Sequence, residues 1–157
     1  MTCRFEGLTV DCADPRTLAA FWCAVLGYTV GEDRDGELVE IGPSEPSDLA
    51  ELRTRPLAPE ILFVRVPEAR SGKNRLHLDV CPIDGGQAEE LRRILALGAR
   101  HVDIGQGEGR SWYVLADPEG NEFCLVRSLA EGHFVDQPPH DQQPDDQPRR
   151  SESPEAT

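Results

Sequence analysis

The hydrophobic and polar positions of the chain fall into two similar series. Each series begins with a strand-like run, at residues 4–11 and 75–80, and continues into a segment whose apolar residues recur at helical spacing, at about 15–26 and 87–97. Both helical segments end in a Leu-Gly pair, and short strand-like runs separated by Gly, Pro and Asp follow each of them. The repeated order predicts a duplicated module of one strand, one helix and three strands.

Local signals define the first helix most clearly. Asp14 is suited to cap its N-terminus, Pro15 to occupy the first helical position, and Gly27 to follow the last turn. The apolar face expected of this helix consists of Leu18, Phe21, Trp22, Val25 and Leu26. The face that the second helix is expected to bury consists of Leu91, Ile94 and Leu95.

The remaining strands complete the two modules. They are expected at 28–30, 38–41 and 61–66 in the first module and at 99–104, 111–116 and 121–127 in the second. The predicted fold class is α+β, with βαβββ modules at about 4–66 and 75–128 that form one open, curved sheet around a cup. The folded domain is expected to cover 1–130. Residues 131–157 form an acidic tail rich in Pro, Gln and Asp, which is expected to be disordered because it lacks the apolar residues of a core.

Alternation along each strand predicts which side chains face this cup. The fifth strand is expected to pack three apolar residues under the helix, namely Leu76, Leu78 and Val80. It then turns three polar residues towards the cup, namely Arg75, His77 and Asp79. By the same reasoning the eighth strand faces the cup with Glu122, Cys124 and Val126, and the fourth with Ile61, Phe63 and Arg65. Trp112 and Tyr113 are neighbours in the seventh strand, so one of the two faces the cup.

Charge and composition exclude several classes of partner. The formal net charge of −13 opposes contact with a phosphate backbone, so no nucleic-acid partner is predicted. No apolar run is long enough to span a membrane, and the N-terminus lacks a signal-peptide pattern, so no membrane contact and a cytoplasmic location are expected. Five cysteines without a CxxC pair argue against a disulfide framework or a structural zinc knuckle.

Two segments of the chain resemble a known superfamily. Residues 117–123, DPEGNEF, precede an apolar strand and are similar to the C-terminal signature of the glyoxalase/bleomycin-resistance/dioxygenase proteins, the vicinal oxygen chelate superfamily. Residues 73–79, KNRLHLD, resemble a glyoxalase-like domain subfamily within it. The resemblance covers about residues 4–128 and implies the same fold of two βαβββ modules. It implies metal-dependent isomerases, dioxygenases and thiol transferases among the relatives, and also proteins that bind antibiotics or small ligands without a metal.

The metal-using relatives place one ligand on each of four central strands. The resemblance maps these positions to Gly7 on the first strand, Cys124 on the eighth, Arg75 or His77 on the fifth, and Phe63 or Arg65 on the fourth. Glycine and phenylalanine bind no metal and arginine repels one, so no cofactor is predicted as a requirement. A divalent metal such as Zn²⁺ or Fe²⁺ is the alternative, with His77 and Glu122 as ligands and Asp79 or Cys124 as further donors.

Seven residues are predicted to contact a small-molecule ligand: Arg65, Arg75, His77, Asp79, Trp112, Glu122 and Cys124. The arginines would hold a carboxylate or phosphate, the tryptophan would supply a flat apolar wall, and the histidine would orient the ligand or transfer a proton. The alternatives are internal ion pairs for the arginines, a hydrogen bond to a cup carboxylate for the histidine, and core packing for the tryptophan. Cys124 is an inert wall or, alternatively, a nucleophile.

The pattern as a whole favours a glyoxalase-like small-molecule-binding protein without a required metal. A homodimer is expected, because open sheet edges are usually covered by a partner. One alternative is a metal-dependent lyase, isomerase or dioxygenase of the same superfamily with an atypical site. Another is a regulatory or scaffold module whose tail contacts a partner. The sequence leaves open whether any reaction is catalysed.

Overall fold

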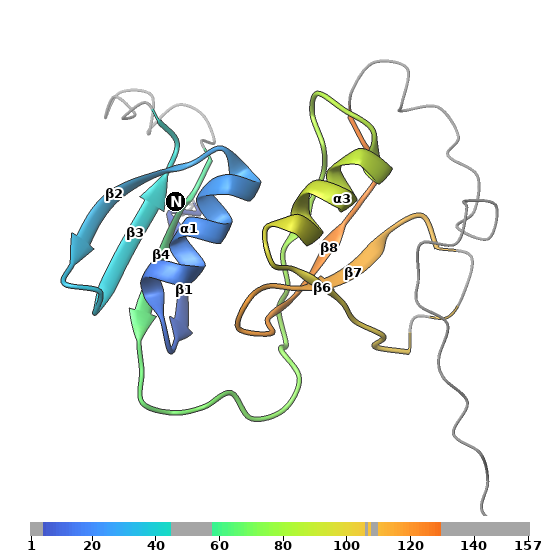
Figure 1. The fold of residues 1–157 in the computed structure, drawn as a ribbon. Coiled ribbons are helices and arrows are strands. Elements are labelled where there is room, and N and C mark those ends of the chain that lie inside the picture. Colours follow the sequence, from blue (N-terminus) through green and yellow to red (C-terminus); the bar gives the residue numbers. More distant parts are fainter. Residues whose placement is uncertain (1–4, 45–57, 106, 108–109, 130–157) are drawn as a thin grey trace, which may run out of the picture.

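The computed structural model describes residues 5–44, 58–105, 107 and 110–129, and its elements repeat one order in each half (Figure 1). The first half contains β1 (Gly7–Cys12), α1 (Pro15–Leu26), β2 (Thr29–Arg34), β3 (Leu38–Gly42) and β4 (Glu60–Arg65). The second contains β5 (Asp79–Val80), α3 (Gln87–Ala96), β6 (Arg100–His101), β7 (Tyr113–Ala116) and β8 (Glu122–Leu125). The predicted α+β class and the duplicated βαβββ module are confirmed. The tail predicted at 131–157 lies outside the described residues.

Each half forms a four-stranded sheet of its own. The strand orders are β1-β4-β3-β2 and β5-β8-β7-β6. In both sheets the first strand runs parallel to its neighbour, and the other neighbours are antiparallel. The predicted open arrangement consists of two sheets, one from each half, and no described strand of one half pairs with a strand of the other. The strand β5, with only two residues, offers little backbone for a connection between the sheets.

The ends of α1 follow the predicted signals. The Asp14 carboxylate accepts hydrogen bonds from the Thr17 hydroxyl (2.7 Å) and the Thr17 backbone N–H (3.2 Å), and these bonds lower the pKa of Asp14. Pro15 occupies the first turn, and Gly27 ends the helix with a φ of 68°, a left-handed conformation that disfavours a residue with a Cβ. Neither of the described helices is long and apolar enough to cross a membrane.

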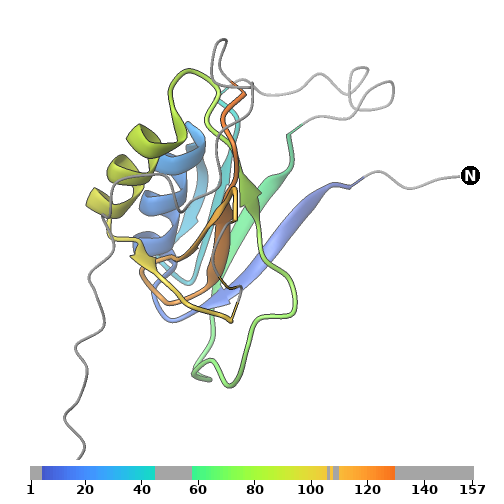
Figure 2. The same cartoon turned by 90° about the vertical axis from the view of Figure 1, so that its right-hand side faces the viewer.

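Both helices lie on the same side of the two sheets (Figure 2). We call the opposite side of each sheet its open face. The core between helices and sheets is shared by the two halves, because the ring of Trp22 on α1 lies 5.1 Å from the ring of Phe123 on β8. Phe21 approaches the same ring at 6.0 Å, again edge to face. The first helix therefore joins the halves through aromatic packing.

The turn between β7 and β8 fastens the second half to α1. Asp117 is 1% exposed, and its carboxylate accepts hydrogen bonds from the Trp22 indole N–H (3.3 Å) and from two backbone N–H groups of its own turn (2.9 and 3.0 Å). The neighbouring Glu119 carboxylate accepts from the backbone N–H groups that precede α1, those of Ala13 (2.9 Å) and Asp14 (2.6 Å). A segment that the sequence marks as a turn thus also holds the two halves together.

The predicted orientation of the fourth strand is wrong. Ile61 and Phe63 do not face the open side; they are 4% and 0% exposed and belong to the core. Phe63 pairs with Val10 of β1 and Val39 of β3, and both neighbours point towards the helices. The run at 61–64 is apolar on both faces, so alternation alone could not assign its inner side, and pairing with β1 decides it.

The strands of the second half are shorter than predicted. Of the strand expected at 75–80, only Asp79 and Val80 pair with β8, and Leu76, expected under the helix, is 81% exposed. Leu78 and Val80 pack against the core as predicted. The other three expected strands are reduced to β6, β7 and β8. Residues 75–78 therefore form a connecting segment that precedes the strand.

Candidate functional site

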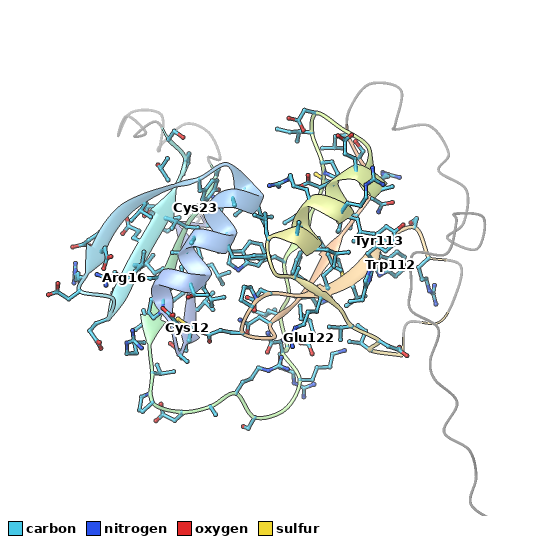
Figure 3. The ribbon with its side chains drawn as sticks, in the orientation of Figure 1. Cys12, Arg16, Cys23, Trp112, Tyr113 and Glu122 are labelled. Carbon is cyan, nitrogen blue, oxygen red and sulfur yellow. The ribbon has the colours of Figure 1, made fainter. Side chains whose placement is uncertain are left out.

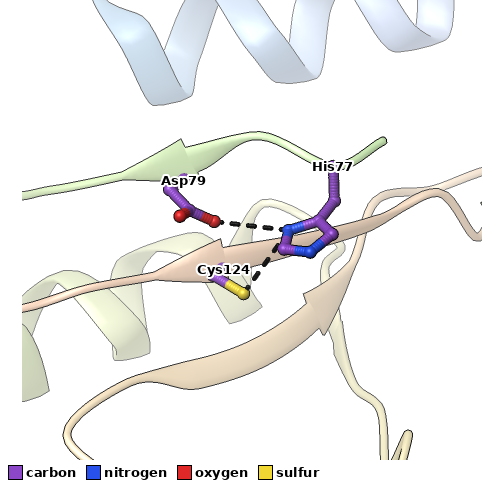
Figure 4. Close-up of side chains that lie close together, drawn as sticks. All are labelled: His77, Asp79 and Cys124. Carbon is purple, nitrogen blue, oxygen red and sulfur yellow. Dashed lines mark hydrogen bonds and ion pairs between the residues drawn. The ribbon is translucent and has the colours of Figure 1, made fainter. Parts of the chain in front are cut away.

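Three side chains with metal-ligand or acid–base chemistry meet on the open face of the second sheet: His77, Asp79 and Cys124 (Figure 4). Their donor atoms all lie within 4.8 Å of one another. Nδ1 of His77 is 3.3 Å from Oδ1 of Asp79 and 3.7 Å from Sγ of Cys124. Cys124 is 6% exposed, whereas the His77 side chain is 40% exposed. The cluster therefore combines a buried thiol with an accessible ring, and the prediction that these residues share one face is confirmed.

The register of β5 and β8 brings the cluster together. Asp79 and Cys124 are paired residues of parallel strands, so their side chains lie on the same face. Phe123 and Leu125 point into the core, which turns Cys124 between them to the open face. The Cys124 backbone N–H donates to the carbonyl of Leu78 (2.8 Å), and this bond holds the segment with His77 beside β8.

Both neighbours of the His77 ring approach the same nitrogen. A carboxylate oxygen 3.3 Å from Nδ1 is favourable when Nδ1 carries a proton, so we infer the Nδ1–H form, with Asp79 as acceptor. Among the described residues no hydrogen bond reaches Nε2 of His77. In a neutral ring this nitrogen is an acceptor. The arrangement leaves one oriented acceptor on an accessible ring.

This geometry does not form a nucleophilic triad. In such a triad the carboxylate and the nucleophile contact opposite nitrogens of the histidine, whereas Asp79 and Cys124 share Nδ1 of His77. Burial, and then the charge and hydrogen bonding of Asp79, raise the pKa of the Cys124 thiol to about 11. A thiol with this pKa is protonated near neutral pH, and a protonated thiol is a poor nucleophile.

The donor set is of a kind that holds a divalent metal. Imidazole nitrogen, carboxylate oxygen and thiolate sulfur are the usual ligands of Zn²⁺, and His77, Asp79 and Cys124 offer one of each. All three belong to the second half. In the first half a Cβ added at Gly7 would lie 3.0 Å from the carbonyl oxygen of Glu60, so this position of β1 has no donor and little room for a side chain. A bound metal would have to displace the protons of Nδ1 and of the thiol.

Glu122, which is labelled in Figure 3, forms hydrogen bonds with residues outside the cluster. Its Oε2 accepts hydrogen bonds from Nη1 of Arg70 (3.3 Å) and from the backbone N–H of Asn74 (3.3 Å), both in the connection between the halves. The expectation that Glu122 and His77 form the metal pair differs from the structure, in which Asp79 and Cys124 accompany His77. Sequence reasoning missed Arg70 and Asn74, because alternation says nothing about residues outside the strands.

The two arginines expected in the cup differ in their surroundings. Arg65 shares the helix side of β4, and its guanidinium donates to the carbonyls of Ala13 and Gly36 and pairs with Glu37 (3.1 Å). Its predicted orientation towards the cup is therefore wrong, for the same reason as that of the rest of the strand. Arg75 is exposed in the segment before β5, near His77 in sequence, and is not used in any ion pair with the described residues.

The aromatic pair at the start of β7 divides as expected. Tyr113 is 7% exposed and belongs to the core, 6.1 Å from the ring of His101. Trp112 is half-buried just before the strand, with the guanidinium of Arg110 5.4 Å above its ring. The tryptophan is thus the member of the pair outside the core. Figure 3 shows both residues on the side of the second half that is remote from the first.

A hollow of about 300 Å³ lies where the end of α1 meets β5 and α3. Its walls include Val25, Leu26, Val80, Cys81, Ile83 and Leu125. Asp79 is the one residue that lines the hollow and also belongs to the cluster. The hollow is mostly apolar and follows the junction between the halves, and neither His77 nor Cys124 lines it.

Known proteins with a similar sequence pattern or a similar structure share this fold. A family model described as the glyoxalase-like domain matches residues 7–126. A glyoxalase/bleomycin resistance protein/dioxygenase family enzyme from Burkholderia phytofirmans has a similar structure, with 21% identity, a TM-score of 0.54, and coverage of 78% of this chain and 97% of that one. No curated protein matches the chain.

Fosfomycin resistance proteins of the FosX type have the same fold. FosX from Mesorhizobium loti is 13% identical, with a TM-score of 0.56 over 82% of this chain and 96% of that one. A FosX mutant from Listeria monocytogenes, complexed with Mn(II) and a dihydroxypropylphosphonic acid, is 16% identical, with a TM-score of 0.53 over 80% of this chain and 90% of that one. At these identities the likeness shows the fold alone.

Proposed function

Because the chain belongs to the family of the glyoxalase-like domain, we propose that it binds a small organic molecule at the open face of its second sheet, without a required metal. One observation carries the proposal. The His77 ring is 40% exposed, its Nδ1 is held by Asp79 and Cys124, and its Nε2 has no partner among the described residues. Ligand sites commonly combine a few precisely oriented polar groups with buried, mostly apolar side chains, and here Nε2 of His77 is the oriented acceptor and Cys124 the buried side chain beside it.

The neighbouring residues have distinct proposed roles. Asp79 orients the ring and Cys124 forms the wall behind it. Arg75 meets an anionic group of the ligand if the ligand has one, and Trp112 supplies an apolar edge. Arg65 is left out of the site because its guanidinium is bound to the loops around β1 and β3.

The proposal is tested with protein freed of metal by a chelator. A fragment library is screened by ligand-detected NMR, and each hit is titrated against wild type, His77→Ala and Arg16→Ala. Arg16 pairs with Asp33 on the surface of the first half, so its variant is the control for general damage. We expect hits that lose at least about tenfold in affinity with His77→Ala, the cost of one hydrogen bond, and bind the control normally. Hits that bind His77→Ala as well as wild type would contradict the proposal.

A second candidate function is a metal-dependent enzyme of the same superfamily. The meeting of three different donor atoms within 4.8 Å favours it. His77, Asp79 and Cys124 would hold the ion, which would supply Lewis-acid activation of a bound oxygen group. Metal analysis separates the two candidates. The first predicts less than about one-tenth equivalent of zinc, iron, manganese or nickel in purified protein, and the second predicts a stoichiometric ion that His77→Ala removes.

The proposal includes a homodimer. In the described part of the chain, β1 and β5 each have a single strand neighbour, so each sheet has a free edge next to the junction of the halves. Free edges favour association with another copy. Light scattering at micromolar concentration is expected to give twice the 17.3 kDa of one chain, and a mass of one chain at all concentrations would contradict it. A cytoplasmic location stays a prediction from the sequence.

A further inference from the structure

We propose that Glu122 is a positioning residue that holds His77 against Asp79 and Cys124. The Glu122 carboxylate contacts neither the histidine nor the other cluster members, but it holds the segment that carries the histidine. The inference depends on the proposed function only in taking His77 as the ligand-contacting residue. The geometry that supports it is independent of any ligand.

His77 needs such support because it is not part of a strand. β5 begins at Asp79, and residues 75–78 make no ladder with a neighbouring strand. An exposed side chain on such a segment is normally free to change rotamer and backbone position. The ring is nevertheless placed 3.3 Å from Asp79 and 3.7 Å from Cys124. The backbone on both sides of His77 must therefore be restrained.

The restraint after His77 comes from β8. The backbone N–H of Cys124 donates to the carbonyl of Leu78 at 2.8 Å. This bond fixes the residue that directly follows the histidine. It extends the pairing of the two strands by one hydrogen bond beyond the residues of β5 itself.

The restraint before His77 comes from Glu122, also on β8. Oε2 of Glu122 accepts from the backbone N–H of Asn74 and from Nη1 of Arg70, each at 3.3 Å. The same Arg70 nitrogen donates to the side-chain oxygen of Asn74 (3.1 Å), and the Asn74 amide donates to Asn121 (3.3 Å). The Glu122 side chain is only 12% exposed, so its bond to the Asn74 N–H is partly shielded from water, whereas the Arg70 side chain is 41% exposed.

The two anchors leave a span of three residues between them, 75–77. Glu122 and Cys124 are two positions apart on one strand, so both lie on the open face. Their hydrogen bonds hold the connecting segment on either side of the span, at residues 74 and 78. The network also joins the two sequence motifs: residues 73–79 supply Asn74 and His77, and residues 117–123 supply Asn121 and Glu122. The two motifs are therefore joined by hydrogen bonds, and together they position the His77 ring.

The test reads the His77 ring in the ligand-free, metal-free protein. The two ring nitrogens are recorded by long-range proton–nitrogen NMR at mildly alkaline pH, where imidazole side chains are neutral. The resonances are assigned with His77→Gln. In wild type they are expected to be widely separated, as in a single Nδ1–H form. In Glu122→Ala and Glu122→Asp, which cannot reach Asn74, the separation is expected to shrink as the two tautomers mix.

Glu122→Gln gives the matched control, because its amide oxygen still reaches the Asn74 N–H, and it is expected to keep the wild-type separation. Arg16→Ala, in the first half, controls for a general loss of stability. If Glu122→Ala does not fold, Glu122→Asp supplies the reading. A wild-type separation in a folded Glu122→Asp or Glu122→Ala would overturn the proposal, as would the same change in Glu122→Gln or Arg16→Ala. The absence of any ligand would contradict the proposed function but leave this result unaffected.

Discussion

Replacing Asp117 with alanine is expected to destabilise the protein by about 3–5 kcal/mol, because it removes a buried charge acceptor from several donors at once. The Asp117 carboxylate is 1% exposed and accepts from the Trp22 indole (3.3 Å), the Glu119 and Asn121 backbone N–H groups (3.0 and 2.9 Å), and the Asn121 amide (2.9 Å). Each bond to a charged acceptor contributes about 1.5–3 kcal/mol. The turn donors are half-buried and recover part of this from water, so the full sum is not expected.

The indole donor separates the inter-half contact from the turn itself. Trp22 is 4% exposed, and its N–H finds no water when Asp117 is gone. Trp22→Phe is the variant used, because it removes the indole N–H together with only part of the ring. Trp22→His is unsuitable because it changes the packing more. We expect the Asp117→Ala and Trp22→Phe effects to be coupled, with the double variant less destabilised than the sum of the single variants by about 1–2 kcal/mol.

The assay is equilibrium unfolding in urea, monitored by circular dichroism. The free energies of unfolding of the variants are compared with one common slope against urea concentration. Asp11→Ala, which removes an exposed carboxylate on β1, is the matched control and is expected to change stability by less than about 0.5 kcal/mol. A folded domain of this size has a stability of about 5–15 kcal/mol, so the Asp117 effect is easily measured. A loss below about 1 kcal/mol for Asp117→Ala would refute the view that this turn joins the halves.

Three further predictions concern the cysteines and the tail. Burial raises the pKa of both Cys12 and Cys124 from 9.0 to about 11, so the stability that the two buried thiols contribute is present below pH 9 and is lost as the pH rises towards 11. In thermal melts, the melting midpoint of the Cys12→Ala/Cys124→Ala variant should fall less than that of wild type over this pH range, and equal falls would contradict the prediction. In zinc titrations between about pH 7 and 8.5, affinity should rise about tenfold per pH unit as the thiol releases its proton, and Cys124→Ser should flatten this slope; a slope unchanged by the substitution would exclude the thiol as a ligand. Truncation after Phe134 should leave the melting midpoint unchanged, and a drop of several degrees would show that the tail packs on the domain.

Local sequence signals predicted the framework well where a few neighbouring residues decide the structure. Asp14, Pro15 and Gly27 define the ends of α1 because capping bonds and a left-handed turn depend on residues close in sequence. The same holds for the shared face of Asp79 and Cys124, because strict alternation around buried Phe123 and Leu125 leaves a single choice for Cys124 and Asp79 pairs with it.

Prediction failed where distant segments decide the structure. The run with Ile61 and Phe63 is apolar on both faces, and only its pairing with β1 shows which face is buried. Glu122 alternates correctly with Phe123, yet its partners Arg70 and Asn74 lie in an irregular connection whose path no local pattern defines. The exposed Leu76 has the same origin, since β5 begins later than alternation suggests.

The most direct test of the ligand site is the map of backbone amide shifts that a bound fragment causes in metal-free, nitrogen-15-labelled protein. The largest shifts are expected on the open face of the second sheet, at His77, Asp79, Cys124 and Val114, the residue of β7 that pairs with Cys124, and His77→Ala is expected to abolish them. Shifts confined to the first sheet, or shifts that persist in His77→Ala, would contradict the claim that His77 presents the ligand contact.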